Sequence, residues 1–98
     1  MRTLRGPRGC PWDKKQTPER LTPFAVEEAL ELEDAILHKE KKDVMEELGD
    51  LLFQVVFQSQ MAEERGDFGL DDVIDHLSRK MIERHPHVFA NSAALTVQ

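Results

Sequence analysis

Glu27-Glu28-Ala29-Leu30-Glu31 and Glu46-Glu47-Leu48-Gly49-Asp50 are the two segments that decide the fold of this chain. Both lie in sequence with strong helical patterning. A three-residue spacing places Glu28 beside Glu31 on one helical face and Glu47 beside Asp50 on another. The two segments therefore predict two carboxylate pairs on two neighbouring helices.

The spacing between the pairs predicts how the two helices are arranged. Midway between them lies the polar run 38–43, which is typical of the turn of an antiparallel helical hairpin. Each pair then lies roughly 12 Å from the turn, given the rise of an α-helix. Folding at this turn brings the pairs to one level, with Glu31 across from Glu47 and Glu28 across from Asp50.

Four carboxylates at one level predict a metal site. Like charges a few ångströms apart repel and raise one another's pKa values, and a divalent cation removes that repulsion. Oxygen ligands favour Mg²⁺, Mn²⁺ or Ca²⁺, and Mg²⁺ keeps positions open for water and phosphate oxygens. The competing interpretation is that these residues form solvated acidic faces. The mirrored placement about a turn favours metal binding by Glu28, Glu31, Glu47 and Asp50.

The composition fits one small globular domain over residues 1–98. Hydrophobic residues make up 40% of the chain and charged residues 33%, which indicates a modest core and favours self-association. A net charge of −6 argues against binding to nucleic-acid backbones, which requires a basic surface. A phosphate-bearing small molecule stays compatible with it, because a bound metal reverses the local field.

Nothing in the sequence indicates a membrane or a secreted location. The longest apolar run, residues 51–57, is interrupted by Gln54 and is far too short to span a bilayer. The N-terminus has arginines but no hydrophobic segment of a secretory signal. Cys10 is the only cysteine, so no internal disulfide forms, which suits a reducing compartment. We expect a cytoplasmic protein that binds neither membranes nor nucleic acid.

Helical patterning dominates the chain, and no strand alternation is found. Residues 1–16 read as an irregular loop, 17–90 as a helical core and 91–98 as a flexible tail. Within the core, helices are expected over about 24–37, 43–65 and 70–84. Pro23 predicts either a short turn before the first of these or a kink within it. The fold class is therefore all-α, with an antiparallel helical hairpin and a further helix.

Three other groups have two interpretations each. Lys80 and Arg84 share one face of the third helix. They form either a solvated basic edge or a clamp for phosphates beside the metal. Trp12 is either a hydrophobic plug or a ring that stacks on a base. His85 and His87 lack the further ligands of a zinc site nearby in sequence, so packing is favoured for them.

Several motifs in order resemble the MazG family of nucleoside triphosphate pyrophosphohydrolases, and the match runs from about residue 4 to residue 90. The motifs are LRGP at 4–7, GCPWD at 9–13, QT at 16–17, EExxE at 27–31, ELGDLLFQVVF at 47–57 and RHPHVF at 84–89.

This resemblance implies a helical bundle completed by two subunits, as a homodimer or a higher homo-oligomer. It also implies Mg²⁺-dependent hydrolysis of a nucleoside triphosphate to the monophosphate and pyrophosphate, with Mn²⁺ as a substitute ion. By motif position, the family's basic residues fall on Lys80 and Arg84. Its metal ligands fall on Glu28, Glu31, Glu47 and Asp50, the four residues that the hairpin brings together.

The mechanism that follows is attack of a metal-activated water on the α-phosphorus, with pyrophosphate leaving. Glu27 is a spare carboxylate, which either accepts the water's proton or orients a metal ligand, or is simply a solvated acid. Lys80 and Arg84 would neutralise the outer phosphates. Trp12 would contact the base.

Three departures from the family keep an alternative open. Ser78 stands where many relatives have Asn, the chain ends soon after the RHPHVF motif, and that motif and GCPWD resemble the first domain of tandem members. The alternative is a noncatalytic helical module that dimerises or senses a nucleotide or metal. A further one is an enzyme for a narrow substrate.

Overall fold

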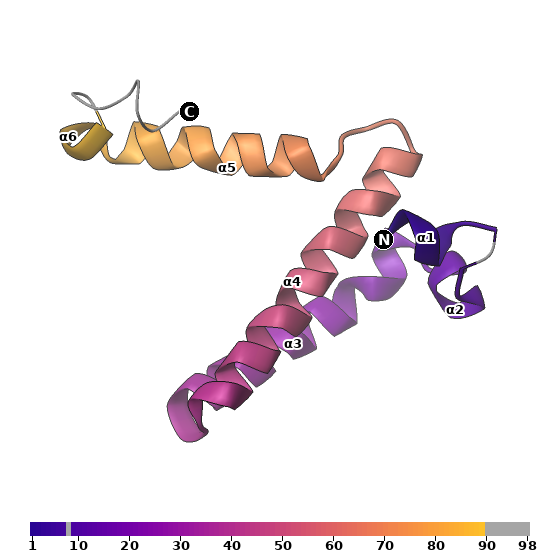
Figure 1. Cartoon of the computed structure of the whole chain (residues 1–98), viewed down its shortest axis with the longest axis horizontal. Coiled ribbons are helices and arrows are strands. Elements are labelled where there is room, and N and C mark those ends of the chain that lie inside the picture. The colour runs from indigo at the N-terminus through magenta and orange to yellow at the C-terminus, as the bar shows by residue number, and fades with distance from the viewer. Residues whose placement is uncertain (8, 90–98) are drawn as a thin grey trace.

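Two long antiparallel helices form the centre of the molecule in a computed structural model, which describes residues 1–7 and 9–89 (Figure 1). The described residues contain helices and loops and no strand, so the all-α prediction is confirmed. The helices are α1 (Arg2–Arg5), α2 (Pro11–Lys14), α3 (Pro18–His38), α4 (Lys41–Glu64), α5 (Leu70–Arg84) and α6 (Pro86–Phe89). The predicted tail, 91–98, lies outside the described residues.

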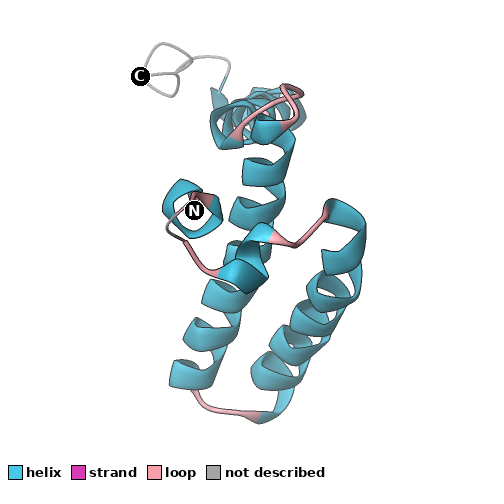
Figure 2. Ribbon diagram, turned by 90° about the vertical axis from the view of Figure 1, so that its right-hand side faces the viewer, coloured by secondary structure: helices cyan, strands magenta, loops and turns pink. Residues whose placement is uncertain are grey.

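The hairpin of α3 and α4 forms as the sequence predicts. Thr17 caps α3, because its Oγ1 accepts a hydrogen bond from the Arg20 backbone N–H at 3.2 Å. The helix continues through Pro23 without a separate first turn. Lys39 and Glu40 then connect the two helices. Figure 2 shows α3 and α4 side by side, joined at one end by this short turn.

The buried core of the hairpin is small. Leu21, Phe57 and Met61 form its fully buried cluster. Alanines allow the helix backbones to approach at Ala35, which is completely buried. Many large apolar side chains are left at least two-fifths exposed, among them Val26, Leu30, Leu37, Met45, Leu48, Leu52 and Phe53. Within the described part of the chain, hydrophobic surface is therefore only partly covered.

Arg5 fastens the N-terminal segment to the hairpin. Its guanidinium lies 5.3 Å from the centre of the Phe57 ring, and its Nη1 donates to the Asp13 carbonyl at 2.6 Å. It also pairs with Glu64 at 2.7 Å, and this hydrogen-bonded pairing lowers the pKa of the Glu64 carboxyl. Two short helices, α1 and α2, form in this segment, which the sequence predicts to be an irregular loop.

The third long helix leaves the hairpin at the far end of α4. Gly66 has a φ of 78°, in the left-handed region that favours glycine at a helix end. The Gly69 backbone N–H donates to Asp72 Oδ2 at 2.9 Å, which satisfies the start of α5. From there α5 runs away from the hairpin (Figure 1). Among the described helices, none combines the length and the hydropathy that a membrane span requires.

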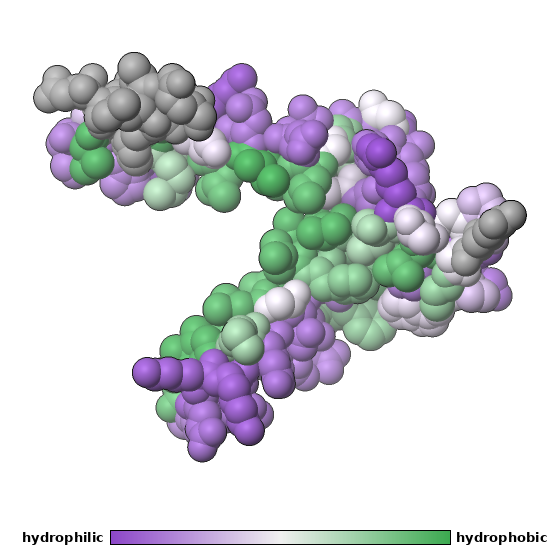
Figure 3. Space-filling model, viewed as in Figure 1, coloured by the Kyte–Doolittle hydropathy of each residue, from purple (hydrophilic) through white to green (hydrophobic). Residues whose placement is uncertain are grey.

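Hydrophobic surface follows the edge of α4 and the edge of α5 that faces it across the open angle between the two helices (Figure 3). Three apolar residues of α5, Ile74, Leu77 and Met81, recur at helical spacing and are each about half exposed. Both helices thus present apolar side chains that the rest of the described residues leave exposed.

Replacing Arg5 with alanine should destabilise the fold by about 1–3 kcal/mol, because two backbone carbonyls and Glu64 lose a charged donor. The matched control is Arg2→Ala. The Arg2 side chain pairs with Glu63 but is 76% exposed, against 10% for Arg5, so its loss should cost much less. Urea denaturation followed by circular dichroism measures both. Equal effects of the two substitutions would contradict the role given to Arg5.

Candidate metal centre

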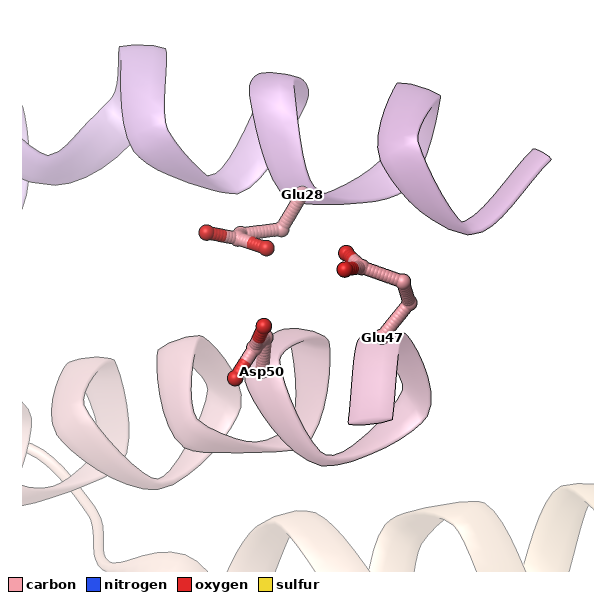
Figure 4. A group of neighbouring side chains, drawn as sticks. All are labelled: Glu28, Glu47 and Asp50. Carbon is pink, nitrogen blue, oxygen red and sulfur yellow. The ribbon is translucent and has the colours of Figure 1, made fainter. Parts of the chain in front are cut away.

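Three carboxylates meet between the two long helices. Glu28 on α3 and Glu47 and Asp50 on α4 each offer an oxygen, and these atoms all lie within 4.8 Å of one another. In Figure 4 the Glu28 side chain points from one helix toward Glu47 and Asp50 on the other. The three-residue spacing on α4 places both of its acids on the face toward α3. The geometry therefore brings together three of the four acids that the sequence places at one level.

Two oxygens in this cluster have no partner among the described residues. Glu28 Oε2 and Glu47 Oε2 are buried and make no hydrogen bond. A buried carboxylate oxygen is costly unless a donor or a cation satisfies it. Carboxylate oxygens are the donors that a divalent cation such as Mg²⁺ prefers, so the cluster fits such an ion, and a bound cation would offset the cost of burying these acids.

Burial and neighbouring negative charge both act on the pKa values of the clustered acids. Burial is the first cause that raises the pKa of Glu28, and the charges of Glu31, Asp50 and Glu47 follow. Burial also raises the pKa of Glu47, followed by the neighbouring Glu31 carboxylate. The repulsion among these acids is therefore present in the folded chain, and a cation would relieve it.

Glu31 stands at the edge of this cluster. It lies outside the group whose oxygens all meet within 4.8 Å, yet it raises the pKa of both Glu28 and Glu47. A cavity of about 640 Å³ runs beside it and is lined by Glu27, Glu31, Glu47 and Lys39, with Pro23, Val26, Leu30 and Asp34. Glu27 faces this cavity and is exposed.

Lys39 is a residue of this region that the sequence analysis does not identify. It pairs with Asp34 at 3.6 Å, and its charge lowers the pKa of Glu47 against the other influences. In the sequence, Lys39 is marked only by its position in the turn, where exposed lysines are common simply because they are soluble. The folded hairpin is what places it beside the acids.

The other predicted site residues lie apart from the cluster. Lys80 and Arg84 are on the distal part of α5, which leads away from the hairpin in Figure 1. Trp12 on α2 is 50% exposed and lies edge-on to Phe24, with the ring centres 6.1 Å apart. Phe24 precedes Glu28 by one helical turn, so the indole stands on the N-terminal side of the acids.

Known proteins are similar in sequence to this chain over most of its length. A family model described as the MazG nucleotide pyrophosphohydrolase domain matches residues 16–89. A nucleoside triphosphate pyrophosphohydrolase/pyrophosphatase MazG of Thermotoga maritima is 54% identical over 94% of this chain, which covers 36% of that protein. A nucleoside triphosphate pyrophosphohydrolase of Escherichia coli K12 is 52% identical over 96% of this chain, again 36% of its own length.

A nucleoside triphosphate pyrophosphohydrolase of Mycobacterium tuberculosis is 41% identical over 85% of this chain and 26% of its own length. The chain thus spans about a third of the Thermotoga and Escherichia proteins, at 36% of each.

Replacing Glu28 with glutamine should raise the melting temperature of the metal-free protein by a few degrees at pH 7. The folded protein holds the Glu28 proton more tightly than the unfolded chain does, because the pKa of Glu28 is raised. Stability without metal therefore falls as pH rises from the ordinary glutamate pKa through the raised value. The difference between variant and wild type should shrink at acidic pH.

Differential scanning fluorimetry in EDTA and in Mg²⁺ measures this effect, with Glu33→Gln on the exposed face of α3 as the control. Mg²⁺ should stabilise the wild type more than Glu28→Gln. A lower melting temperature for Glu28→Gln in EDTA would contradict the account of the cluster.

Proposed function

Because the chain belongs to the MazG nucleotide pyrophosphohydrolase domain family, we propose that it is a metal-dependent enzyme that hydrolyses a nucleoside triphosphate to the monophosphate and pyrophosphate. The observation that carries the proposal is the cluster of Glu28, Glu47 and Asp50, with two buried oxygens that accept no hydrogen bond from the described residues. A helical module that only dimerises has no need of such a costly arrangement, whereas a metal-sensing module would share it, so turnover is what separates the two. The matched relatives are longer than this chain. The activity and substrates that their names give are therefore proposed for this chain and not taken over from them.

The carboxylates have separate roles in this proposal. Glu28, Glu47 and Asp50 hold the ion, and Glu31 completes the set from the edge of the cluster. When bound, Mg²⁺, or Mn²⁺ in its place, supplies charge for the phosphate oxygens and lowers the pKa of a bound water. Glu27 faces the adjoining cavity, where a carboxylate that is not a ligand is available to accept a proton from water.

Positive charge for the outer phosphates has two sources. Lys39 lines the cavity beside Glu31 and Glu47, so it reaches the site from within the same chain. Lys80 and Arg84 stand on α5, which leads away from the hairpin. They serve a phosphate only if a second subunit brings α5 of one chain to the acids of the other.

A homodimer or larger homo-oligomer is therefore part of the proposal. Leu48, Leu52 and Val55 follow one another at helical spacing on α4, and Leu52 is 59% exposed. Burying this stripe against the same stripe of a second copy would remove apolar surface from water and complete a helical bundle. A cytoplasmic location, where nucleoside triphosphates are abundant, agrees with this activity.

Activity should depend on Glu47 and on Mg²⁺. The assay offers ribo- and deoxynucleoside triphosphates and separates monophosphate, diphosphate, pyrophosphate and phosphate. Wild type should yield monophosphate and pyrophosphate only with metal. Glu47→Ala should lose at least about 100-fold in kcat/KM, since even residues that only orient metal ligands cost 10–100-fold.

Glu46→Ala is the matched control, because Glu46 is the adjacent acid, is exposed and lies outside the cluster. It should keep near-normal turnover. A folded, Mg²⁺-binding wild type that forms no product would instead support the noncatalytic nucleotide- or metal-sensing module.

Self-association should depend on the apolar stripe of α4. Leu52→Glu buries a charge in the proposed interface and should shift the protein toward monomer in analytical ultracentrifugation. Gln60→Glu adds the same charge near the C-terminal end of α4, where the Gln60 amide donates to Glu64. It should leave the sedimenting mass unchanged. A wild type that sediments as a monomer at micromolar concentration would refute the dimer.

A further inference from the structure

Two exposed aromatic rings stand on the N-terminal side of the acidic site. Trp12 of α2 is half exposed, and Phe24 of α3 is 42% exposed. Their ring centres lie 6.1 Å apart, and their planes are inclined by 81°. In an edge-on pair of this kind, the two rings cover at most one face between them, so ring faces stay open to a further aromatic group.

Phe24 lies on the side of α3 that carries the acids of the adjoining cavity. Glu27 and Glu31 both line this cavity, and Phe24 precedes them by three and seven residues. Residues at these intervals share one face of a helix. Pro23, the neighbour of Phe24 in the chain, is the first residue of α3 that lines the cavity. The aromatic pair therefore stands where the α3 wall of the cavity begins.

Positive charge marks the opposite end of the same cavity. Among the described residues that line it, Lys39 is the one basic side chain. It follows Glu31 by eight residues, which is about 12 Å along a helix. Lys39 pairs with Asp34 at 3.6 Å, but both side chains are more than half exposed, so water screens the pair and a phosphate can compete for the lysine. The order along α3 is thus aromatic, acidic and then basic.

The short helix that carries Trp12 is fixed by side chains around it. α2 has four residues, too few to be stable by itself. Gln16 Nε2 donates to the Trp12 carbonyl at 3.1 Å, and Arg5 Nη1 donates to the carbonyl of the buried Asp13 at 2.6 Å. The indole is therefore held in place without a ligand, which lowers the entropy cost of stacking a ligand on it.

We propose that the nucleotide lies along α3, with its base against Trp12 and Phe24 and its outer phosphates toward Lys39. This inference rests on the proposed function, because it requires a nucleoside triphosphate whose phosphates meet a metal at the acids. Such a molecule has the same order of chemistry along its length: an aromatic base, phosphates that bind the metal, and a terminal negative charge. The reverse direction would place the terminal phosphate against two aromatic rings, away from Lys39.

The fluorescence of Trp12 tests the position of the base. Trp12 is the only tryptophan of a chain without tyrosine, so the emission of the protein reports on this ring. With Mg²⁺ present, α,β-methylene-ATP, which cannot be split into monophosphate and pyrophosphate, should quench the emission until it saturates. AMP should do the same. Inorganic tripolyphosphate, which lacks a base, should bind in calorimetry and leave the emission unchanged.

Two substitutions should divide these three ligands in opposite ways. Phe24→Leu should weaken binding of α,β-methylene-ATP and AMP by about tenfold, because an aromatic contact with the base is lost. It should leave the affinity for tripolyphosphate unchanged. Lys39→Ala should weaken α,β-methylene-ATP and tripolyphosphate by about threefold or more, because the outer phosphates lose a cation. It should leave the affinity for AMP unchanged.

Phe68→Leu and Lys42→Ala are the matched controls. Phe68 is 48% exposed in the loop between α4 and α5, Lys42 is exposed in the first turn of α4, and neither lines the cavity. Both variants should keep the wild-type affinities for all three ligands. Melting temperatures check that each variant folds, and the wild-type fluorescence titrations test the position of the base without any variant.

Three results would overturn the inference. The first is an emission that saturating α,β-methylene-ATP leaves unchanged, or that tripolyphosphate changes as much. The second is an equal loss of all three ligands in Phe24→Leu or in Lys39→Ala. The third is an emission that changes with protein concentration and not with nucleotide, which would assign the two rings to a contact between copies of the chain.

Failure of the proposed function gives a different pattern. ATP turnover is measured on the same samples. The expected binding pattern without turnover would support the direction of the nucleotide and refute the hydrolysis. Turnover without the expected binding pattern would refute the direction alone. A wild type that neither binds nor turns over a nucleotide would refute both.

Discussion

The register of α3 against α4 is the constraint on which the site depends. The turn at Lys39 and Glu40 fixes it at one end of the hairpin, and the packing of Phe57 with Leu21 fixes it toward the other. A shift of one residue along an α-helix turns a side chain by about 100°. Such a shift would carry Glu28 away from the acids of α4. The small core thus does more than stabilise the hairpin, because it sets which carboxylates meet.

The acidic side chains of this protein lie in two opposite electrostatic environments. Glu63 and Glu64 receive arginines from the N-terminal segment, and these hydrogen-bonded pairs lower the pKa of both carboxyls. No positively charged side chain among the described residues hydrogen-bonds Glu28 or Glu47, and the pKa values of both carboxyls are raised. The first arrangement stabilises the folded chain. The second costs stability and is the kind of local conflict that is expected where a protein binds a ligand.

Two kinds of group stay unsatisfied among the described residues. Glu28 Oε2 and Glu47 Oε2 are buried and accept no hydrogen bond from these residues, and apolar side chains along α4 and α5 are exposed. The buried oxygens fit a cation, and the exposed apolar side chains fit a hydrophobic partner. The proposed metal site and the proposed self-association would each satisfy one of them. The sequence composition already points to self-association, since a chain of this size buries little.

The sequence by itself determined the three long helices and the place of the turn, and it predicted Glu28, Glu31, Glu47 and Asp50 at one level, because helical spacing and symmetry about a turn are local properties that residue order encodes. In the structure Glu31 lies outside the closest group of acids, and α1 and α2 form where the sequence predicts a loop. It did not reveal Lys39, which looks like an ordinary polar residue until the folded hairpin places it beside Glu31 and Glu47. The direction of α5, which separates Lys80 and Arg84 from the acids of their own chain, was equally hidden. Only the tertiary structure decided these points, because burial and long-range proximity arise when segments distant in sequence pack together.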